Sequence, residues 1–273
     1  MQPRHIVISG ASGGLGGALA RHYAGAGIHL TLLGRDRDRL EAVGQACTSQ
    51  QATADLCAAD VTDTVAMAEL IQRADDQAAI DLVIAGAGVS GEVCAPGTNR
   101  DRSHHIIAVN VTGTLNTVEP VLPRMIARRH GAICIIASLA GLRGIARGPV
   151  YSASKAALIT LGQGWRDALS PHDVGVTVAC PGYLLTAMTA NHSFKMPFAV
   201  SPDDAAETIA KGVARNRGRV TVPAALAPVG WAFSALPARL TAPLLPGRGR
   251  PIPPVNRRRQ GVVQTHGNKD HGA

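Results

Sequence analysis

Short apolar runs alternate with longer stretches of helical spacing through the first 220 residues of the chain. The apolar runs predict strands at residues 5–9, 28–34, 53–60, 80–88, 131–138, 174–182 and 218–223, and the β-branched content of residues 5–9 indicates that the first of them is buried. The stretches between them predict helices at residues 15–27, 37–47, 62–76, 100–129, 149–170 and 202–216. Strands and helices that alternate in this way form right-handed parallel βαβ units. We therefore predict one α/β domain with a doubly wound parallel sheet of about seven strands. Helices should cover both faces, and ligands should bind at the carboxyl ends of the strands.

The alternation stops near residue 223, where the composition of the chain changes. Residues 220–238 carry no charge, and three prolines interrupt them, which argues against a membrane-spanning helix. We expect residues 1–223 to form the folded domain, and residues 224–273 to form an apolar, proline-containing segment followed by a basic, disordered tail. Two interpretations of the segment stay open: it covers the domain or an oligomer interface, or residues 220–250 contact a membrane surface.

The positive charge is concentrated at the C-terminal end. Residues 239–273 contribute seven Arg or Lys and one Asp to a formal net charge of +8, so the rest of the chain is close to neutral. A basic binding face on the folded domain is therefore not expected. Because no recognition motif accompanies the tail, nucleic acid is not an expected partner.

Cysteine usage and the first residues indicate the compartment. The five cysteines lie far apart without a C-x-x-C pair, which indicates reduced core residues rather than disulfides or zinc ligands. No metal is therefore expected. The apolar run at the start of the chain is too short for a secretory signal. We expect a cytoplasmic protein, with membrane-peripheral attachment as the alternative.

The turn after the first predicted strand is rich in glycine and reads SGASGGLGG. It spaces Gly10, Gly14 and Gly16 as G-x-x-x-G-x-G. Glycine is needed where the backbone turns tightly or approaches a pyrophosphate closely. The helix that begins near Leu15 directs free N–H groups and its positive dipole end toward such a phosphate. Glycines also build ordinary loops, but at the first βα turn this pattern predicts dinucleotide binding.

The end of the second predicted strand bears on the choice of cofactor. It reads LLGRDRDRL and places Arg35 where a site for NAD usually has an acidic side chain that holds the ribose 2′-hydroxyl. An arginine suits a 2′-phosphate instead, although Asp36 follows it directly. The alternative is that Arg35 and Arg37 are solvated residues at a helix start. We predict that NADP(H) is favoured over NAD(H).

Tyr151 and Lys155, in the stretch YSASK, form a candidate acid/base pair. Hydride transfer to a carbonyl needs a proton donor at the oxygen, but the ordinary tyrosine pKa of about 10 is high for a base at neutral pH. Residues i and i+4 of a helix share one face, so Lys155 can lie beside Tyr151 and lower its pKa. The spacing alone also occurs by chance in many helices.

The surroundings strengthen this interpretation. Ser138 ends a predicted strand, where its hydroxyl can hold a substrate oxygen, and Asn110 is a polar residue inside a predicted helix that faces the sheet. In PGYLLT, Pro181 and Gly182 can turn the chain over a nicotinamide, and Thr186 can reach its carboxamide or phosphate.

With these motifs in order, the chain resembles the short-chain dehydrogenase/reductase family over residues 5–223. The matching stretches are SGASGGLG, AADV, VNVTG, IIAS, YSASK and PGYLLT. The resemblance implies a single Rossmann-type domain that forms a homodimer or homotetramer. It also implies that Tyr151 is the general acid/base, that Lys155 lowers its pKa and binds the nicotinamide ribose, and that Ser138 orients the substrate. Asn110 would anchor, through a water, a proton relay behind Lys155.

The family's cofactor contacts carry over to these positions: Gly10, Ser12, Gly14, Leu15, Gly16, Arg35, Asp60, Val61, Ala87, Gly88, Tyr151, Lys155, Pro181, Gly182 and Thr186. Within that set, Asp60 and Val61 would contact the adenine ring. One departure is AGAG at residues 85–88, where the family usually has Asn-Asn-Ala-Gly. The missing asparagines normally brace the sheet and line the pocket, so their absence bears on cofactor affinity.

We therefore predict an oxidoreductase that transfers hydride between NADP(H) and the carbonyl or alcohol group of a small substrate. Met188, Phe194, Met196 and Phe198 suggest an apolar substrate surface, and ordinary packing of a lid explains them equally well. Two alternatives remain: a cofactor-binding sensor or scaffold with little turnover, and a membrane-peripheral reductase of a lipid-like ketone.

Overall fold

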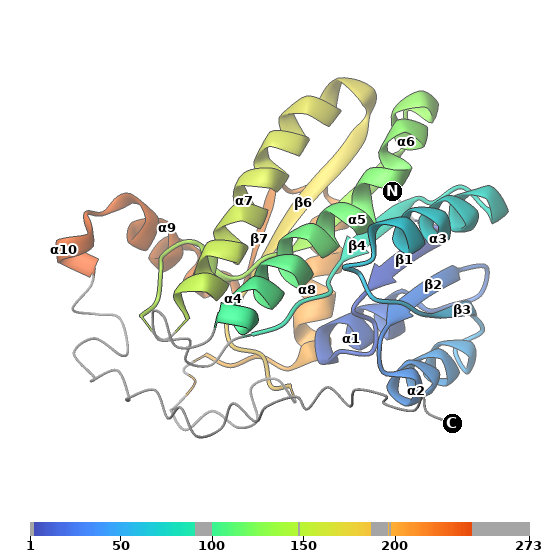
Figure 1. Cartoon of the computed structure of the whole chain (residues 1–273), viewed down its shortest axis with the longest axis horizontal. Coiled ribbons are helices and arrows are strands. Elements are labelled where there is room, and N and C mark those ends of the chain that lie inside the picture. Colours follow the sequence, from blue (N-terminus) through green and yellow to red (C-terminus); the bar gives the residue numbers. More distant parts are fainter. Residues whose placement is uncertain (1–2, 91–99, 147, 187–195, 197, 242–273) are drawn as a thin grey trace, which may run out of the picture.

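The chain folds around a seven-stranded sheet in which all neighbouring strands are parallel (Figure 1). The computed structural model describes residues 3–90, 100–146, 148–186, 196 and 198–241. The strands, in sequence order, are β1 (His5–Ser9), β2 (His29–Gly34), β3 (Thr53–Ala58), β4 (Leu82–Ala85), β5 (Gly131–Ile136), β6 (Val174–Pro181) and β7 (Arg219–Val222). Their order across the sheet is β3-β2-β1-β4-β5-β6-β7, so the direction of winding reverses between β1 and β4. This confirms the predicted doubly wound fold and places its ligand-binding crevice at that reversal.

Helices cover both faces of the sheet. The main helices are α1 (Gly14–Tyr23), α2 (Arg37–Thr48), α3 (Thr64–Gln77), α4 (Arg100–Ile107), α5 (Gly113–Val118), α6 (Leu122–Arg128), α7 (Pro149–Leu169) and α8 (Pro202–Ala214). Val7 and Val83 face a core shared with α3, α5, α6 and α7. Ile6, Ile8 and Leu82 face a second core shared with α1, α2 and α8. Because alternate strand residues point to opposite faces, every central strand is buried twice, as in other doubly wound sheets.

The predicted helix at residues 100–129 is wrong as a single element. The chain forms α4, then a π-helical turn (Ala108–Thr112), then α5, a 3₁₀ turn (Glu119–Val121) and α6. Pro120 and Pro123 lack a backbone N–H, and they lie where the 3₁₀ turn and α6 begin. Asn110 lies in the π-helical turn, an irregularity that is frequent at functional sites.

Residues after β7 pack on the domain next to the turn that follows Ser138. A 3₁₀ turn (Ala224–Leu226) leads into α9 (Ala227–Ala235) and α10 (Ala238–Thr241). A methyl group added at Gly230 of α9 would lie 2.7 Å from Leu142 Cδ1 and 3.3 Å from Leu139 Cδ2. The start of the apolar segment therefore covers the domain. The tail expected to be disordered lies within residues 242–273, which are outside the described residues.

Within the part of the chain that the structure describes, no helix combines the length and the apolar character needed to cross a bilayer.

Candidate active site

A cavity of about 660 Å³ opens at the carboxyl ends of the strands, on both sides of the reversal between β1 and β4. Sixteen of the seventeen residues predicted for the site line it, and Asn110 lies buried behind its wall. Residues that the sequence did not single out also line it: Gly13, Leu33, Gly34, Asp36, Arg39, Ala59, Gly86, Val89, Val109, Ile136, Ala137 and Leu184. Most of them are adjacent in sequence to a predicted site residue. Sequence adjacency to those residues is the signal that could have identified them.

The floor of the cavity is a close approach between the β1 turn and the end of β4. Gly10 has a φ of +76°, and a Cβ placed there would lie 2.8 Å from the Ala87 backbone. A Cβ at Gly16 would overlap the carbonyl oxygen of Gly10. Only glycine satisfies both constraints, so these glycines form a bare backbone surface of the kind that a pyrophosphate requires.

Helix α1 presents its N-terminus to this surface without a side-chain cap. Gly13 at the N-cap makes no capping hydrogen bond, and the first turn contains no acidic residue. The first N–H groups of a helix have no intrahelical acceptor, so they can bind an anion. Thr186 reaches the same place from the opposite wall, because a Cβ at Gly14 would lie 2.6 Å from Thr186 Cγ2. These contacts place the predicted phosphate cradle and Thr186 together.

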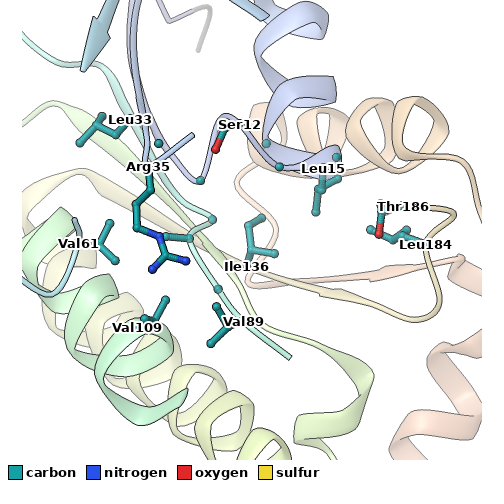
Figure 2. A pocket seen from close by; sticks show the side chains of 18 of the residues that line it. Ser12, Leu15, Leu33, Arg35, Val61, Val89, Val109, Ile136, Leu184 and Thr186 are labelled. Carbon is teal, nitrogen blue, oxygen red and sulfur yellow. The ribbon is translucent and has the colours of Figure 1, made fainter. Parts of the chain in front are cut away.

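Arg35 occupies the other end of the cavity. Figure 2 shows its guanidinium extending into the pocket toward Val61, Val89 and Val109, well away from Thr186. Among the described residues, this guanidinium has no hydrogen-bond or ion-pair partner, whereas Asp36 pairs with Arg39 at 3.1 Å. The carboxylate of Asp36 is therefore engaged elsewhere, and the charge of Arg35 acts on Asp60, whose pKa it helps to lower.

Asp60 and Val61 follow β3 beside Arg35. The backbone N–H and the hydroxyl of Thr62 both donate to Asp60 Oδ1, at 2.9 and 2.8 Å. These hydrogen bonds hold the pKa of Asp60 below its usual range. Val61 is 6% exposed and packs against Gly113 of α5, and it forms an apolar patch opposite Arg35.

Tyr151 and Ser138 meet at the centre of the site. Pro149 begins α7, so Tyr151 lies in the first turn, where it is directed at the cavity. Ser138 follows β5, accepts a hydrogen bond from Ala140 N at 3.1 Å and donates to the Pro181 carbonyl at 3.3 Å. Burial raises the pKa of Tyr151, and a hydrogen bond with Ser138 opposes that rise. Tyr151 is therefore protonated at neutral pH in this structure.

Lys155 lies one helical turn after Tyr151 and is 5% exposed. Its Nζ donates to the Ile136 carbonyl at 2.8 Å and lies 5.9 Å from the centroid of the Tyr151 ring. Burial lowers the pKa of Lys155 to about 8. Burial is the largest cause that shifts the pKa of Tyr151, and the lowering of that pKa by Lys155 stays a prediction.

Asn110 braces the strand end that the AGAG stretch leaves without asparagines. Its Oδ1 accepts from Val89 N at 2.8 Å, and its Nδ2 donates to the Val89 carbonyl at 3.1 Å and to Ser154 Oγ at 2.9 Å. The Ser9 hydroxyl accepts from the Gly86 and Ala87 N–H groups at 3.2 and 3.4 Å. The bracing that the missing asparagines would give is thus supplied from β1 and from the π-helical turn.

Gly88 keeps Asn110 and Lys155 close together. A Cβ at Gly88 would lie 3.4 Å from Asn110 Oδ1 and 3.5 Å from Lys155 Nζ. The Thr114 hydroxyl donates to the Asn110 carbonyl at 2.8 Å, and the Ser154 hydroxyl donates to the Tyr151 carbonyl at 2.7 Å. Ser154 thereby connects Asn110 to the first turn of α7, a role that the sequence did not suggest.

Two further expectations concern the neighbourhood of the site. Of the predicted apolar substrate surface, Met188 and Phe194 lie outside the described residues, Met196 is half-buried, and Phe198 is 65% exposed. Among the residues that the structure describes, no group of three or more His, Cys, Asp or Glu side chains could hold a metal ion.

Comparisons with known proteins agree with this geometry. A sequence model of the family described as short chain dehydrogenase matches residues 4–196. An uncharacterized oxidoreductase of Myxococcus xanthus is 38% identical over 228 residues, which cover 83% of this chain and 90% of that protein.

Solved structures share the fold. A short-chain dehydrogenase from Sphingobium yanoikuyae in complex with NADPH has a TM-score of 0.76 at 24% identity, covering 90% of this chain and 98% of that one. A short chain dehydrogenase from Mycobacterium paratuberculosis bound to NAD has a TM-score of 0.71 at 22% identity, covering 80% of this chain and 95% of that one.

Proposed function

The chain belongs to the short-chain dehydrogenase/reductase family of oxidoreductases, and from that premise we propose that it interconverts a carbonyl and an alcohol group with NADP(H). The observation that carries the proposal is the convergence of Tyr151, Ser138 and Lys155 on a cavity that also holds a bare phosphate cradle. A proton donor and an anion site in one cavity are what such a reaction needs.

The residues present fit a dinucleotide. Gly10 and Gly16 pack so closely on neighbouring backbone that neither position could carry a Cβ. The uncapped N-terminus of α1 offers free N–H groups beside them. Two structural neighbours carry NADPH and NAD in the same fold, which supports a nicotinamide cofactor. We propose that Gly10, Gly14 and Gly16 hold the pyrophosphate, with Ser12, Leu15 and Thr186 around it.

The preference for NADP(H) rests on Arg35. A guanidinium with no partner among the described residues, near the apolar patch at Val61, can form charge-assisted hydrogen bonds to a 2′-phosphate. Asp36 does not compete for that role, because its carboxylate caps α2 and pairs with Arg39.

The proton steps follow from the pKa values of the site. When bound, a reduced nicotinamide would supply the hydride. Ser138 holds the substrate oxygen, and the Tyr151 hydroxyl donates its proton to that oxygen as the alcohol forms. Burial favours the protonated form of Tyr151, so the site is set up to donate. Lys155, with a pKa of about 8, is mostly charged at neutral pH and stabilises the phenolate that Tyr151 becomes.

Replacement of the proton donor tests this proposal. A panel of ketones is screened with NADPH and NADH by following nicotinamide absorbance, and Tyr151→Phe is then assayed on each active ketone. We expect turnover to fall by about a hundredfold to ten-thousandfold, in line with loss of general acid catalysis. NADPH binding, measured by fluorescence titration, should stay within about twofold of the wild type, which corresponds to less than about 0.5 kcal/mol of binding free energy. Retained turnover would exclude the assignment of Tyr151.

A further inference from the structure

A second hollow, of about 400 Å³, lies beside β7 and shares no lining residue with the dinucleotide cavity. Its wall comes from α8, from β7 at the edge of the sheet, and from the turn that leads into α9 (Figure 1). Cavities of roughly 300–1,000 Å³ are the size at which proteins bind small molecules. The hollow is therefore large enough for a compact ligand.

Four cations and no acidic residue line this hollow. They are Lys211 in the last turn of α8, Arg215 at its C-cap, Arg217 in the connection to β7, and Arg219 on β7. Lys211 pairs with Glu207 at 2.5 Å. Within the described part of the chain, the exposed guanidinium groups of Arg215, Arg217 and Arg219 have no hydrogen-bond or ion-pair partner.

The local structure does not account for this charge. The negative end of the α8 dipole attracts Lys211 and Arg215 in its last turn and at its C-cap. Arg217 and Arg219 lie beyond the end of α8, so the helix dipole does not stabilise their charges in the same way. Residues 242–273 contain six Arg or Lys and one Asp, so by charge the C-terminal tail is a poor occupant. Like charges on one wall repel one another, and an anion from outside the chain relieves that repulsion.

The other side of the hollow is apolar. Leu142, Val220, Ala224 and Ala227 line it, with Thr221 between the apolar and cationic walls. A hydrated inorganic anion would use only the cationic wall. A molecule with one anionic group and a short hydrocarbon body would use both, since burial of its apolar surface adds about 25 cal/mol per Å².

We propose that this hollow is a binding site for a small amphipathic anion, with a carboxylate or phosphate group on Arg217 and Arg219 and an apolar body against Leu142 and Ala227. Arginine forms paired hydrogen bonds with a carboxylate or a phosphate, which favours binding in one defined orientation over non-specific electrostatic attraction. The site is separate from the dinucleotide cavity, so the proposal does not depend on the proposed oxidoreductase activity.

Calorimetric titration of the full chain with octanoate tests the proposal, with inorganic phosphate and octan-1-ol as comparison probes. Octanoate should bind at least tenfold more tightly than either comparison probe. Arg217→Gln and Arg219→Gln should each weaken octanoate binding about tenfold or more, since each loses charge-assisted hydrogen bonds. Arg73→Gln, an exposed cation on α3, is the matched control and should leave the affinity unchanged. Saturating NADPH should not displace octanoate.

Several results would overturn the proposal. One is equal octanoate affinity in the wild type, Arg217→Gln and Arg219→Gln; another is complete displacement by NADPH. Phosphate binding as tight as octanoate binding would reject the apolar contribution. A change of sedimentation coefficient on mutation of Arg217 or Arg219 would make the hollow an interface between copies instead. Raising the salt concentration on the wild type checks the charge without any mutation: affinity that does not fall would also contradict the proposal.

Discussion

Burial acts in opposite directions on the two ionisable side chains at the centre of the site. It raises the pKa of Tyr151 and lowers that of Lys155, because in each case the neutral form is easier to bury. The sequence predicted that Tyr151 and Lys155 would share one face of a helix, and both side chains do lie on the cavity side of α7. The sequence could not predict that Lys155 would donate to the Ile136 carbonyl, because that contact depends on where β5 ends relative to α7.

Arg35 gives the sharpest test at this scale. Arg35→Ala removes the free cation opposite Val61 and should weaken NADPH binding at least tenfold, since hydrogen bonds to charged groups contribute about 1.5–3 kcal/mol. NADH lacks the 2′-phosphate, so its dissociation constant should hardly change. Fluorescence titration of both cofactors measures the two values. Arg37→Ala, at the exposed first residue of α2, is the control. Parallel losses for NADPH and NADH would contradict a role at the 2′-phosphate.

At the scale of elements, the cradle is a contact between two pieces of backbone, and Gly16 is its tightest point. Gly16→Ala places a methyl group on the Gly10 carbonyl, so the β1 turn and α1 must move apart. Overpacking of this kind costs about 1–3 kcal/mol, and the displaced N–H groups should weaken cofactor binding tenfold or more. Gly25→Ala is the matched control, because nothing lies within 4 Å of its added Cβ.

The measurements are NADPH titration and thermal unfolding of both glycine variants. Wild-type affinity in Gly16→Ala would mean that the cradle does not touch the cofactor. Reduced affinity in Gly25→Ala as well would point to a general effect on the fold.

Element boundaries could be predicted wherever hydrophobic periodicity was regular. Most predicted strands and helices lie close to their observed limits, because the central strands are buried on both faces. The strand predicted at residues 80–88 is the exception, since β4 spans only Leu82–Ala85. The stretch of residues 100–129 could not be predicted in detail. Its apolar spacing is helical throughout, whereas its π-helical turn is fixed by tertiary hydrogen bonds from Asn110 to Val89 and Ser154.

At the scale of the whole molecule, the amino ends of the strands carry a histidine cluster opposite the active site. His5 is 2% exposed, and its ring stacks on His29 with centroids 4.4 Å apart. His5 Nδ1 donates to the Ala78 carbonyl at 2.7 Å, so Nε2 accepts from the Thr31 hydroxyl at 2.9 Å. Burial is the largest cause that lowers the pKa of His5 below its ordinary 6.5.

This cluster predicts that the domain loses stability in mild acid. As the pH falls below about 6.5, the unfolded chain binds a proton at His5 while the folded chain resists it, so the free energy of unfolding decreases. Thermal unfolding from pH 7.5 to 5.5 should show a falling midpoint in the wild type. His5→Gln should show a flatter dependence, and His22→Gln, at an exposed position, should follow the wild type. Identical slopes in all three proteins would remove His5 as the cause.

The whole-molecule arrangement explains what the sequence could and could not reveal about the site. Residues at strand ends were predictable, because a parallel sheet brings all its carboxyl ends to one edge. The cationic hollow was not, because its arginines look like solvated residues until α8, β7 and α9 are packed together. The oligomeric state stays a prediction.

The side-chain amide of Asn110 forms the hydrogen bonds that no neighbouring strand in the described part of the chain makes to Val89. Beyond Ala85 the chain leaves β4, and no neighbouring strand among the described residues pairs with Val89. Asn110 offers Val89 one hydrogen-bond donor (Nδ2) and one acceptor (Oδ1), as a peptide group in an adjacent strand would. A carboxylate in its place could only accept. One side chain therefore gives Val89 the pair of hydrogen bonds that an adjacent strand would otherwise supply.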